Sequence, residues 1–426
     1  MPETTTSETS AARPGGASAG SALDTILPDG LRVVGERIER SEGVALAIRI
    51  PAGTKDDPAN KLGLANLVQE TLFKGTRKHD ARALSDAFDF YGIHHGNHIG
   101  TETTQVWLGF LPEYTANALS LLREVVSQPS FPQKDCETAK VQAIQELKRL
   151  DDEPLTKVFV LLKELYFGTA WGHPEMGSET TVPDITRSDI EAFWKAQYIP
   201  AGATVAVAGK FDPQALQKDL ETLVANQGTA WPQENPPPPP DKPVRQHVYK
   251  DSEQTQIAMA FPAVPRNDPA YYVLRMAIRI LAGGMSGRLF TEVREKRGLV
   301  YSVGAQTISL RGSGVVYVYA GTTTPRAAET LQVLKAELAR LGQDATQEEL
   351  ERAKIGLKAH LLMDQESTSH RARQLLDDVY YESRAVPVAE IVQKINAVTV
   401  DDVKRYWTTH PFEPYALVML GREALE

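Results

Sequence analysis

The sequence predicts an α+β protein made of two duplicated halves. Each half reads as strands, then helices, then a further strand, which is typical of this class. ITRSDIEAFW at 185–194 returns as VTVDDVKRYW at 398–407, an offset of 213 residues in a chain of 426. Between the two copies, ENPPPPPDKP at 234–243 holds five consecutive prolines, which exclude a helix or a central strand. We therefore expect α+β domains at 21–233 and 244–426, joined by an extended polyproline linker.

The first 20 residues predict a disordered tail, because they are rich in Ser, Thr, Gly, Ala and Pro. They contain no basic start and no apolar stretch, so they do not resemble a secretory signal. No apolar run reaches the ~18 residues that a membrane helix needs. We therefore expect a cytoplasmic protein without a membrane span, or a periplasmic one if a signal was removed.

Composition narrows the function classes further. The net charge is −9, which disfavours non-specific nucleic-acid binding, because that binding depends on neutralising phosphates. The single cysteine, Cys136, excludes an intrachain disulfide framework and a cysteine-based zinc site.

Several strands follow from β-branched content and alternation. The first are LRVVGERI at 31–38 and VALAIRI at 44–50. The segment 44–52 resembles TQIAMAFPA at 255–263, so the second half is expected to repeat the same strand. The run at 306–324 predicts a hairpin that turns at 311–314.

Helix starts are marked by threonines. Thr186 and Thr399 each precede an aspartate by three residues, a spacing that suits a helix N-cap. A helix is predicted at 324–342, with Gly342 at its exit. Another is predicted at 346–363, where a threonine and a glutamate form a capping box.

One motif carries a family resemblance. GLANLVQETLFKGT at 63–76 resembles the signature of the pitrilysin/insulinase peptidases, a family that includes the mitochondrial processing peptidase. Active members carry HxxEH, in which both histidines bind zinc and the glutamate activates water. The same places hold Asn66, Gln69 and Glu70 here. An amide neither replaces a neutral imidazole ligand nor accepts a proton from water.

The family's third zinc ligand is a glutamate on a later helix. The matching stretch, ETAKVQAIQE at 137–146, places Ala139 at that position, with Glu137 and Glu146 nearby. The resemblance therefore implies that this chain binds no catalytic zinc and no other cofactor.

A second motif resembles the family's C-terminal signature. It is GGMSGRLFTEVREKRGLVYSVGA at 283–305. In active enzymes an arginine and a tyrosine, seven residues apart, bind the substrate around the scissile bond, and these correspond to Arg294 and Tyr301. Both side chains can donate hydrogen bonds to a developing oxyanion. The resemblance implies two duplicated α/β sandwich halves of the processing-peptidase type, with strand edges that accept a peptide as an extra strand.

Two polar segments have mainly structural interpretations. His94, His95 and His98 could form a metal site, but on a strand His95 would point away from the other two. Histidines without a carboxylate or cysteine are weak evidence for a metal. The run KDDPAN at 55–60 is expected to be a solvated loop.

The two signatures together predict a non-catalytic subunit of a heterodimeric zinc metallopeptidase. It would lend Arg294 and Tyr301 to the zinc site of an HxxEH-bearing paralogue, and peptides would be the substrate. The sequence is also compatible with a homodimer. One alternative is a structural scaffold, like the family's core subunits of the respiratory complex. Another is an active peptidase with an unusual metal site built from Glu70 and the histidines at 94–98.

Overall fold

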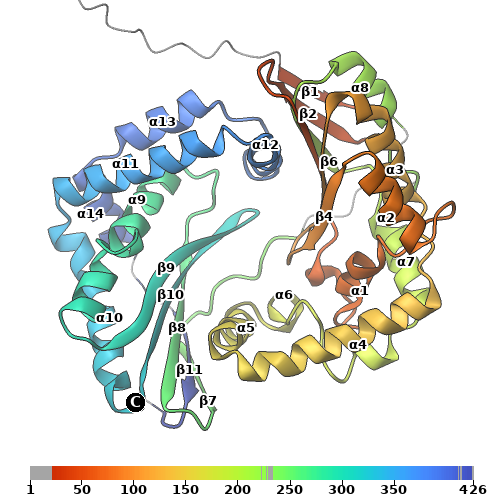
Figure 1. Ribbon diagram of the computed structural model, residues 1–426. Coiled ribbons are helices and arrows are strands. Elements are labelled where there is room, and N and C mark those ends of the chain that lie inside the picture. Colours follow the sequence, from red (N-terminus) through yellow and green to blue (C-terminus); the bar gives the residue numbers. More distant parts are fainter. Residues whose placement is uncertain are drawn as a thin grey trace, which may run out of the picture.

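The computed structural model describes residues 22–221, 223–226, 228, 234–410, 412 and 415–424. The tail predicted at 1–20 lies outside the described residues. Two mixed sheets, each covered by helices, face each other across the molecule (Figure 1). Residues 234–243 form neither helix nor strand, and the first strand of the second sheet begins directly after them.

The first sheet has six strands in the order β1-β2-β6-β3-β5-β4. β2 and β6 are parallel, and every other neighbouring pair is antiparallel. The bounds are β1 Ala22–Ile26, β2 Arg32–Arg37, β3 Val44–Ile50, β4 His94–Ile99, β5 Thr104–Phe110 and β6 Thr204–Gly209.

The second sheet has five strands in the order β7-β11-β8-β10-β9, and it repeats the first sheet from β2 to β4. β7 and β11 are its parallel pair, as β2 and β6 are in the first sheet. The bounds are β7 Val244–Tyr249, β8 Gln254–Ala263, β9 Val300–Leu310, β10 Ser313–Thr323 and β11 Ala416–Gly421. The predicted α+β class and the duplication are both confirmed.

Helices follow the same order in both halves. Those of the first half are α1 Leu64–Thr71, α2 Ala81–Phe90, α3 Thr115–Ser127, α4 Gln133–Arg149, α5 Pro154–Phe167, α6 Thr169–Gly172, α7 Arg187–Gln197 and α8 Pro213–Leu220. Those of the second half are α9 Tyr271–Ala282, the π-helical segment η5 Phe290–Glu295, α10 Ala327–Asp344, α11 Gln347–Asp364, α12 Thr368–Glu382, α13 Val388–Ala397 and α14 Val400–Thr409.

The repeated capping motifs have the same structure in both halves. Thr186 and Thr399 each cap a helix, and each forms a reciprocal capping box with the aspartate three residues on. The indole of Trp194 donates to the carbonyl of Val126 at 2.9 Å, and the indole of Trp407 donates in the same way to Leu338. These matched bonds fix α7 against α3 and α14 against α10.

One helix end differs from its prediction. Gly342 does not end the helix, because α10 continues to Asp344. A Cβ at position 342 would lie 3.2 Å from Oγ1 of Thr408 and 3.4 Å from Cβ of Trp407. The glycine therefore allows α14 to pack closely against α10.

The two halves exchange one helix each. α5 of the first half packs on β8 and β11 of the second sheet, and α12 of the second half packs on β3 and β6 of the first. The buried contacts are apolar; on α12 they include Leu375, Leu376 and Val379. Arg371 on α12 also donates to Glu36 of the first half at 2.6 Å. Each half therefore completes the other's core.

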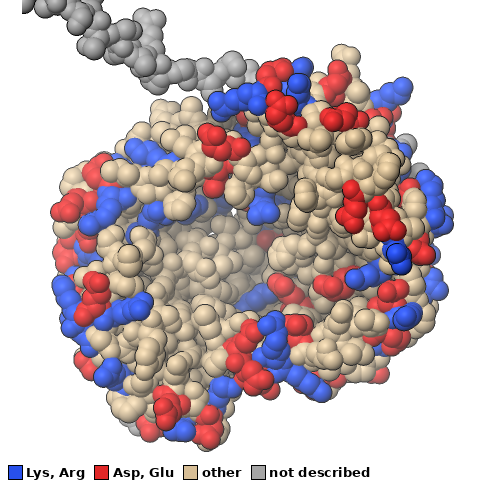
Figure 2. Space-filling model, viewed as in Figure 1, with Lys and Arg blue, Asp and Glu red and all other residues tan. Residues whose placement is uncertain are grey.

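A hollow lies between the two halves (Figure 2). Its visible wall is mostly neither acidic nor basic, whereas charged side chains crowd the outer surface. The outer strands β4 and β9 both border this space (Figure 1). Among the described helices, none combines the length and the apolar character that crossing a membrane requires.

Candidate functional site

The segment that resembles the zinc signature forms helix α1. Its N-cap is Gly63, whose φ is +97°, and a Cβ there would lie 2.6 Å from the carbonyl oxygen of Met176. Only glycine fits this start without strain. Asn66 and Gln69 are each 8% exposed, whereas Glu70 is exposed. The three residues lie at helical spacings of three and four, so they share one face of α1.

Asp57 takes the place of the missing cap side chain. Its carboxylate accepts hydrogen bonds from the backbone N–H groups of Gly63 and Ala65, both at 2.7 Å. Burial raises the pKa of Asp57 to about 7, although these bonds oppose the shift. His173 lies beside it, with Nε2 3.8 Å from Oδ2. The predicted solvated loop at 55–60 is therefore wrong at Asp57, whose side chain has no exposed surface.

The elements that carry the candidate zinc positions, α1 and α4, are adjacent in this fold. α1 packs against α4 and against β4. Ala139 on α4 is buried, and Asn97 on β4 donates a hydrogen bond to the backbone carbonyl of Gln69 at 2.7 Å. Glu137 and Glu146 pair instead with Lys140 and Arg149 on their own helix.

The donor set at these positions does not fit zinc. Asn66, Gln69 and Ala139 provide no imidazole, thiolate or carboxylate, and Glu70 is one carboxylate where zinc needs three or four ligands. Within the described part of the chain, no group of three or more His, Cys, Asp or Glu side chains is placed to hold a metal ion.

The three histidines lie on β4 and separate as the strand alternation predicts. His94 and His98 are exposed on one face. The ring of His95 stacks on both Phe88 and Phe73, with centroid distances of 4.1 and 4.8 Å, and these two phenylalanines also contact each other. Burial lowers the pKa of His95, which favours the neutral ring. His95 is therefore a packing residue, and the structure does not bring the cluster together.

Arg294 lies on η5, a segment with i→i+5 hydrogen bonding. The amide of Lys296 donates to the carbonyl of Thr291 at 3.0 Å. Such π-helical turns are rare and often occur at functional sites. The Arg294 guanidinium is exposed and lies 5.0 Å from the ring centroid of Phe290. No described residue forms a hydrogen bond or an ion pair with it, so its donors point to solvent.

Tyr301 is the second residue of β9, the outer strand of the second sheet. Its side chain is 62% exposed, and its hydroxyl has no hydrogen-bond partner among the described residues. The backbone beside it is fixed, because buried Thr322 donates to the carbonyl of Leu299 at 2.6 Å. Arg294 and Tyr301 therefore flank one short turn and both present unoccupied donors.

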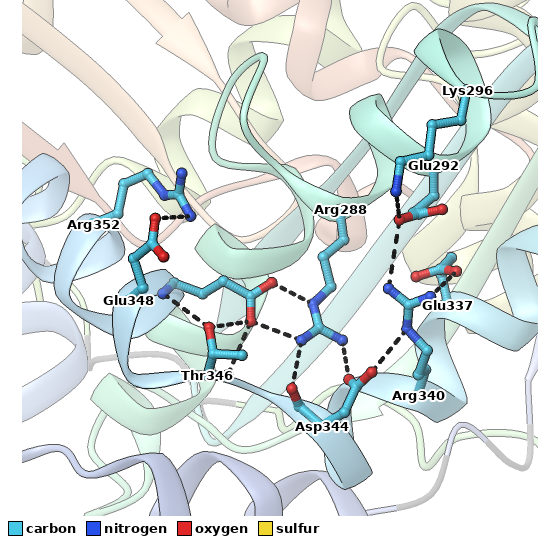
Figure 3. Close-up of polar contacts among 10 residues, drawn as sticks. Arg288, Glu292, Lys296, Glu337, Arg340, Asp344, Thr346, Glu348 and Arg352 are labelled. Carbon is cyan, nitrogen blue, oxygen red and sulfur yellow. Dashed lines mark hydrogen bonds and ion pairs between the residues drawn. The ribbon is translucent and has the colours of Figure 1, made fainter.

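An ion-pair network holds η5 in place (Figure 3). Glu292 on η5 pairs with Lys296 at 2.8 Å, with Arg297 at 2.9 Å and with Arg340 of α10 at 3.6 Å. Arg288, just before η5, is bonded to α11 and to the end of α10 through Glu349 and Asp344. Arg294 thus projects from a helix segment that is anchored on both sides of it.

Sequence reasoning missed the supporting residues. Asp57 and His173 are 116 positions apart and belong to no motif, so only the fold brings them together. The Arg288 and Glu292 contacts are also long-range in part. The motif at 283–305 contains both residues, and their charges beside the candidate Arg294 are the signal that could have pointed to them.

Two family models and several known proteins match this chain. The family model of the insulinases (peptidase family M16) matches residues 32–180, and the model described as the peptidase M16 inactive domain matches residues 184–357. A Rickettsia felis protein named an uncharacterized zinc protease is 26% identical over 88% of this chain and 92% of its own length. One of the same description from Bacillus subtilis is 26% identical over 92% of this chain and 96% of its own.

A solved structure supports the same fold. The peptidase M16 inactive domain protein from Pseudomonas fluorescens superposes with a TM-score of 0.89 at 24% identity, over 95% of this chain and 99% of that one. The two family models together span more than half of the sequence, and the relatives match nearly its whole length. The chain therefore belongs to peptidase family M16, the insulinase family.

Proposed function

We propose that the chain is the substrate-binding, non-catalytic subunit of a two-chain zinc peptidase. The observation that carries this proposal is the contrast between two sites. Arg294 and Tyr301 present unpaired hydrogen-bond donors from an anchored turn. The zinc positions hold Asn66, Gln69 and Ala139, which supply no zinc ligand.

The roles of the two residues follow from their chemistry. A guanidinium and a phenol can both donate to a peptide carbonyl, and both bonds strengthen as negative charge develops on its oxygen. A zinc ion on the partner would supply the activated water. β9 begins beside both residues and is an outer strand, so a peptide can pair with its backbone and lie against Tyr301.

The partner is proposed to be a paralogue that carries HxxEH. A second copy of this chain would again place Asn66 and Gln69 at the zinc positions, so a homodimer would lack the catalytic ligands. The proposed assembly is therefore a heterodimer in which each chain supplies what the other lacks.

Reconstitution tests the proposal. The purified chain is incubated with zinc, desalted and analysed for metal, and its cleavage of unfolded peptides is measured alone and with the HxxEH paralogue of the same genome. We expect less than stoichiometric zinc, no cleavage by the chain alone, and cleavage by the mixture that a chelator abolishes. Chelator-sensitive cleavage by this chain alone overturns the proposal. Binding to the paralogue without any cleavage, or association with a membrane complex instead, indicates a scaffold.

A further inference from the structure

A cavity in the second half lies between the two helices that correspond to those carrying the zinc positions in the first half. α1 follows β3, precedes the outer strand β4 and packs on α4; α9 follows β8, precedes the outer strand β9 and packs on α11. A cavity of about 270 Å³ lies between the end of α9, the loop at 283–287 and α11. Ala353 lines it, 214 residues after Ala139 on the equivalent helix.

Arg279 is the residue that gives this cavity its chemistry. Its side chain is half-buried on the last turn of α9 and lines the cavity. Among the described residues, none accepts a hydrogen bond from its guanidinium or forms an ion pair with it. Burial and the nearby charge of Arg275 lower the pKa of Arg279, as expected for a cation that no carboxylate compensates. The helix dipole favours a cation at this end of α9 but leaves its N–H donors unbonded.

The neighbouring helix is shaped to receive this guanidinium. A Cβ at Gly356 would lie 2.5 Å from Nη2, 2.8 Å from Nε and 3.0 Å from Cζ of Arg279. Gly356 stands inside α11, where glycine costs about 1 kcal/mol relative to alanine. The guanidinium therefore approaches the bare helix backbone edge-on, through Nε and Nη2, in space that any side chain at position 356 would fill.

The other charges around the cavity leave it electropositive. Glu349 lines the wall, but both of its carboxylate oxygens accept from Arg288 at 2.7 Å. Arg352 also lines the wall, and its contact with the exposed Glu348 is long, at 3.7 Å. The acidic group is thus neutralised, while Arg279 and Arg352 remain as available cations.

The remaining wall is small or apolar. Ile280, Ala353 and Ile355 contribute aliphatic surface, and Ser286 contributes a hydroxyl. Ile355 is 63% exposed, so aliphatic surface continues to the rim. The planar guanidinium of Arg279 beside aliphatic walls suits a carboxylate attached to an apolar group, because a guanidinium can donate to both carboxylate oxygens. The volume lies near the lower end of small-ligand sites and suits one terminal residue.

We infer that this cavity binds the C-terminal carboxylate of a peptide whose last side chain is apolar, with Arg279 as the carboxylate-binding residue. The inference rests on the proposed peptide-binding function, and it adds a second anchor outside the turn of Arg294 and Tyr301. A peptide held there would be fixed at its end, while its middle stays free to pair with a strand.

Calorimetric titration of the isolated chain tests the inference. The probes are an N-acetylated peptide that ends in leucine, its C-terminal amide, and acetate. A charge-assisted pair predicts that the acid binds about 10- to 100-fold more tightly than the amide. Equal affinity for acid and amide overturns the inference. Acetate that binds as tightly as the peptide acid also overturns it, because the site then takes a free small anion.

Three variants test whether the preference for the peptide acid over the amide arises in this cavity. Arg279→Gln should reduce the preference for the acid to less than about twofold, since a neutral amide makes no charge-assisted pair. Gly356→Ala should do the same with the arginine retained, because its methyl group displaces the guanidinium. Arg275→Gln, one turn earlier and bonded to Tyr271, should keep the preference. A preference that survives Arg279→Gln in a variant with unchanged circular dichroism overturns the assignment.

The titration and the cleavage assay test the two proposals separately. The titration needs neither zinc nor a partner, so it can succeed when reconstituted cleavage fails. Reconstituted cleavage can likewise succeed when acid and amide bind equally.

Discussion

Glu292 and Lys296 lie one turn apart on the segment that carries Arg294, with carboxylate Oε1 2.8 Å from Nζ. The Lys296 bond, helped by Arg297 and by the charge of Arg340, lowers the pKa of Glu292 to about 2 against burial that opposes the shift. The carboxylate is therefore ionised throughout the physiological range, and it ties η5 to α10. The position of Arg294 depends on this tie.

The ion pairs of Glu292 predict a pH-dependent contribution to the stability of the folded chain. Because folding lowers the pKa of Glu292 from 4.5 to about 2, the folded state binds this proton more weakly than the unfolded state. The contribution is complete above pH 4.5 and is lost as the pH falls toward 2. Urea unfolding should show Glu292→Gln about 1–2 kcal/mol less stable than the wild type at pH 7, a value reduced for solvent screening, with the gap narrowing below pH 4.5.

A matched control is Glu348→Gln. Glu348 is 87% exposed and its contact with Arg352 is 3.7 Å long, so its removal should change stability by less than about 0.5 kcal/mol at any pH. A gap for Glu292→Gln that stays constant from pH 7 to pH 3 would show that the carboxylate charge is not what holds η5.

Arg294 and Tyr301 should control turnover in the reconstituted enzyme. Loss of one donor to a developing oxyanion lowers kcat about 10²- to 10³-fold, so Arg294→Ala and Tyr301→Phe should each fall in that range with nearly unchanged stability. Steady-state kinetics with the HxxEH partner measure this. Arg82→Ala removes an arginine that is 92% exposed on α2 and should leave kcat unchanged. Full turnover by Arg294→Ala would contradict the proposed role.

Local features of the fold were predictable from the sequence. A capping box is encoded in four consecutive residues, so the starts of α7, α11 and α14 follow from Thr186, Thr346 and Thr399. The repeat predicted the duplicated sheet, because equal sequence patterns fold alike. The end of α10 was not predictable. Gly342 has the local pattern of a helix end, but it lies inside α10 and makes room for α14.

Features that depend on distant contacts were not predictable. The exchange of α5 and α12 joins segments far apart in the chain, and amphipathic patterns do not name the sheet that a helix covers. From the sequence Asp57 looks like a loop residue, because the backbone N–H groups that it caps and its neighbour His173 lie outside the segment 55–60. Of the candidate site, the family resemblance supplied the positions, and the fold supplied the adjacency of α1, α4 and β4.

The zinc positions should regain metal when their ligands are restored. The variant that combines Asn66→His, Gln69→Glu, Glu70→His and Ala139→Glu recreates the family's ligand set on α1 and α4, which already pack together. We expect about one zinc per chain after desalting, measured by plasma mass spectrometry. The same variant with Ala139 retained has only two histidine ligands from the set and should lose zinc during desalting. Equal zinc retention by both would show that residue 139 does not face the site.

The exchanged helices predict that the two halves unfold together. Leu376 on α12 is fully buried against Val34, Ala47 and Ala206 of the first sheet. Leu376→Ala should destabilise the chain by about 2–5 kcal/mol, because it leaves a cavity between the halves. Calorimetry should show one transition moved to lower temperature, since α12 belongs to the second half and cannot leave the first sheet without exposing the apolar cluster that the two share. Leu362→Ala, 54% exposed on α11, should move it little. Two separate transitions would contradict this, if the variant lowers only the unfolding temperature of the second half. The halves would then be independent folding units.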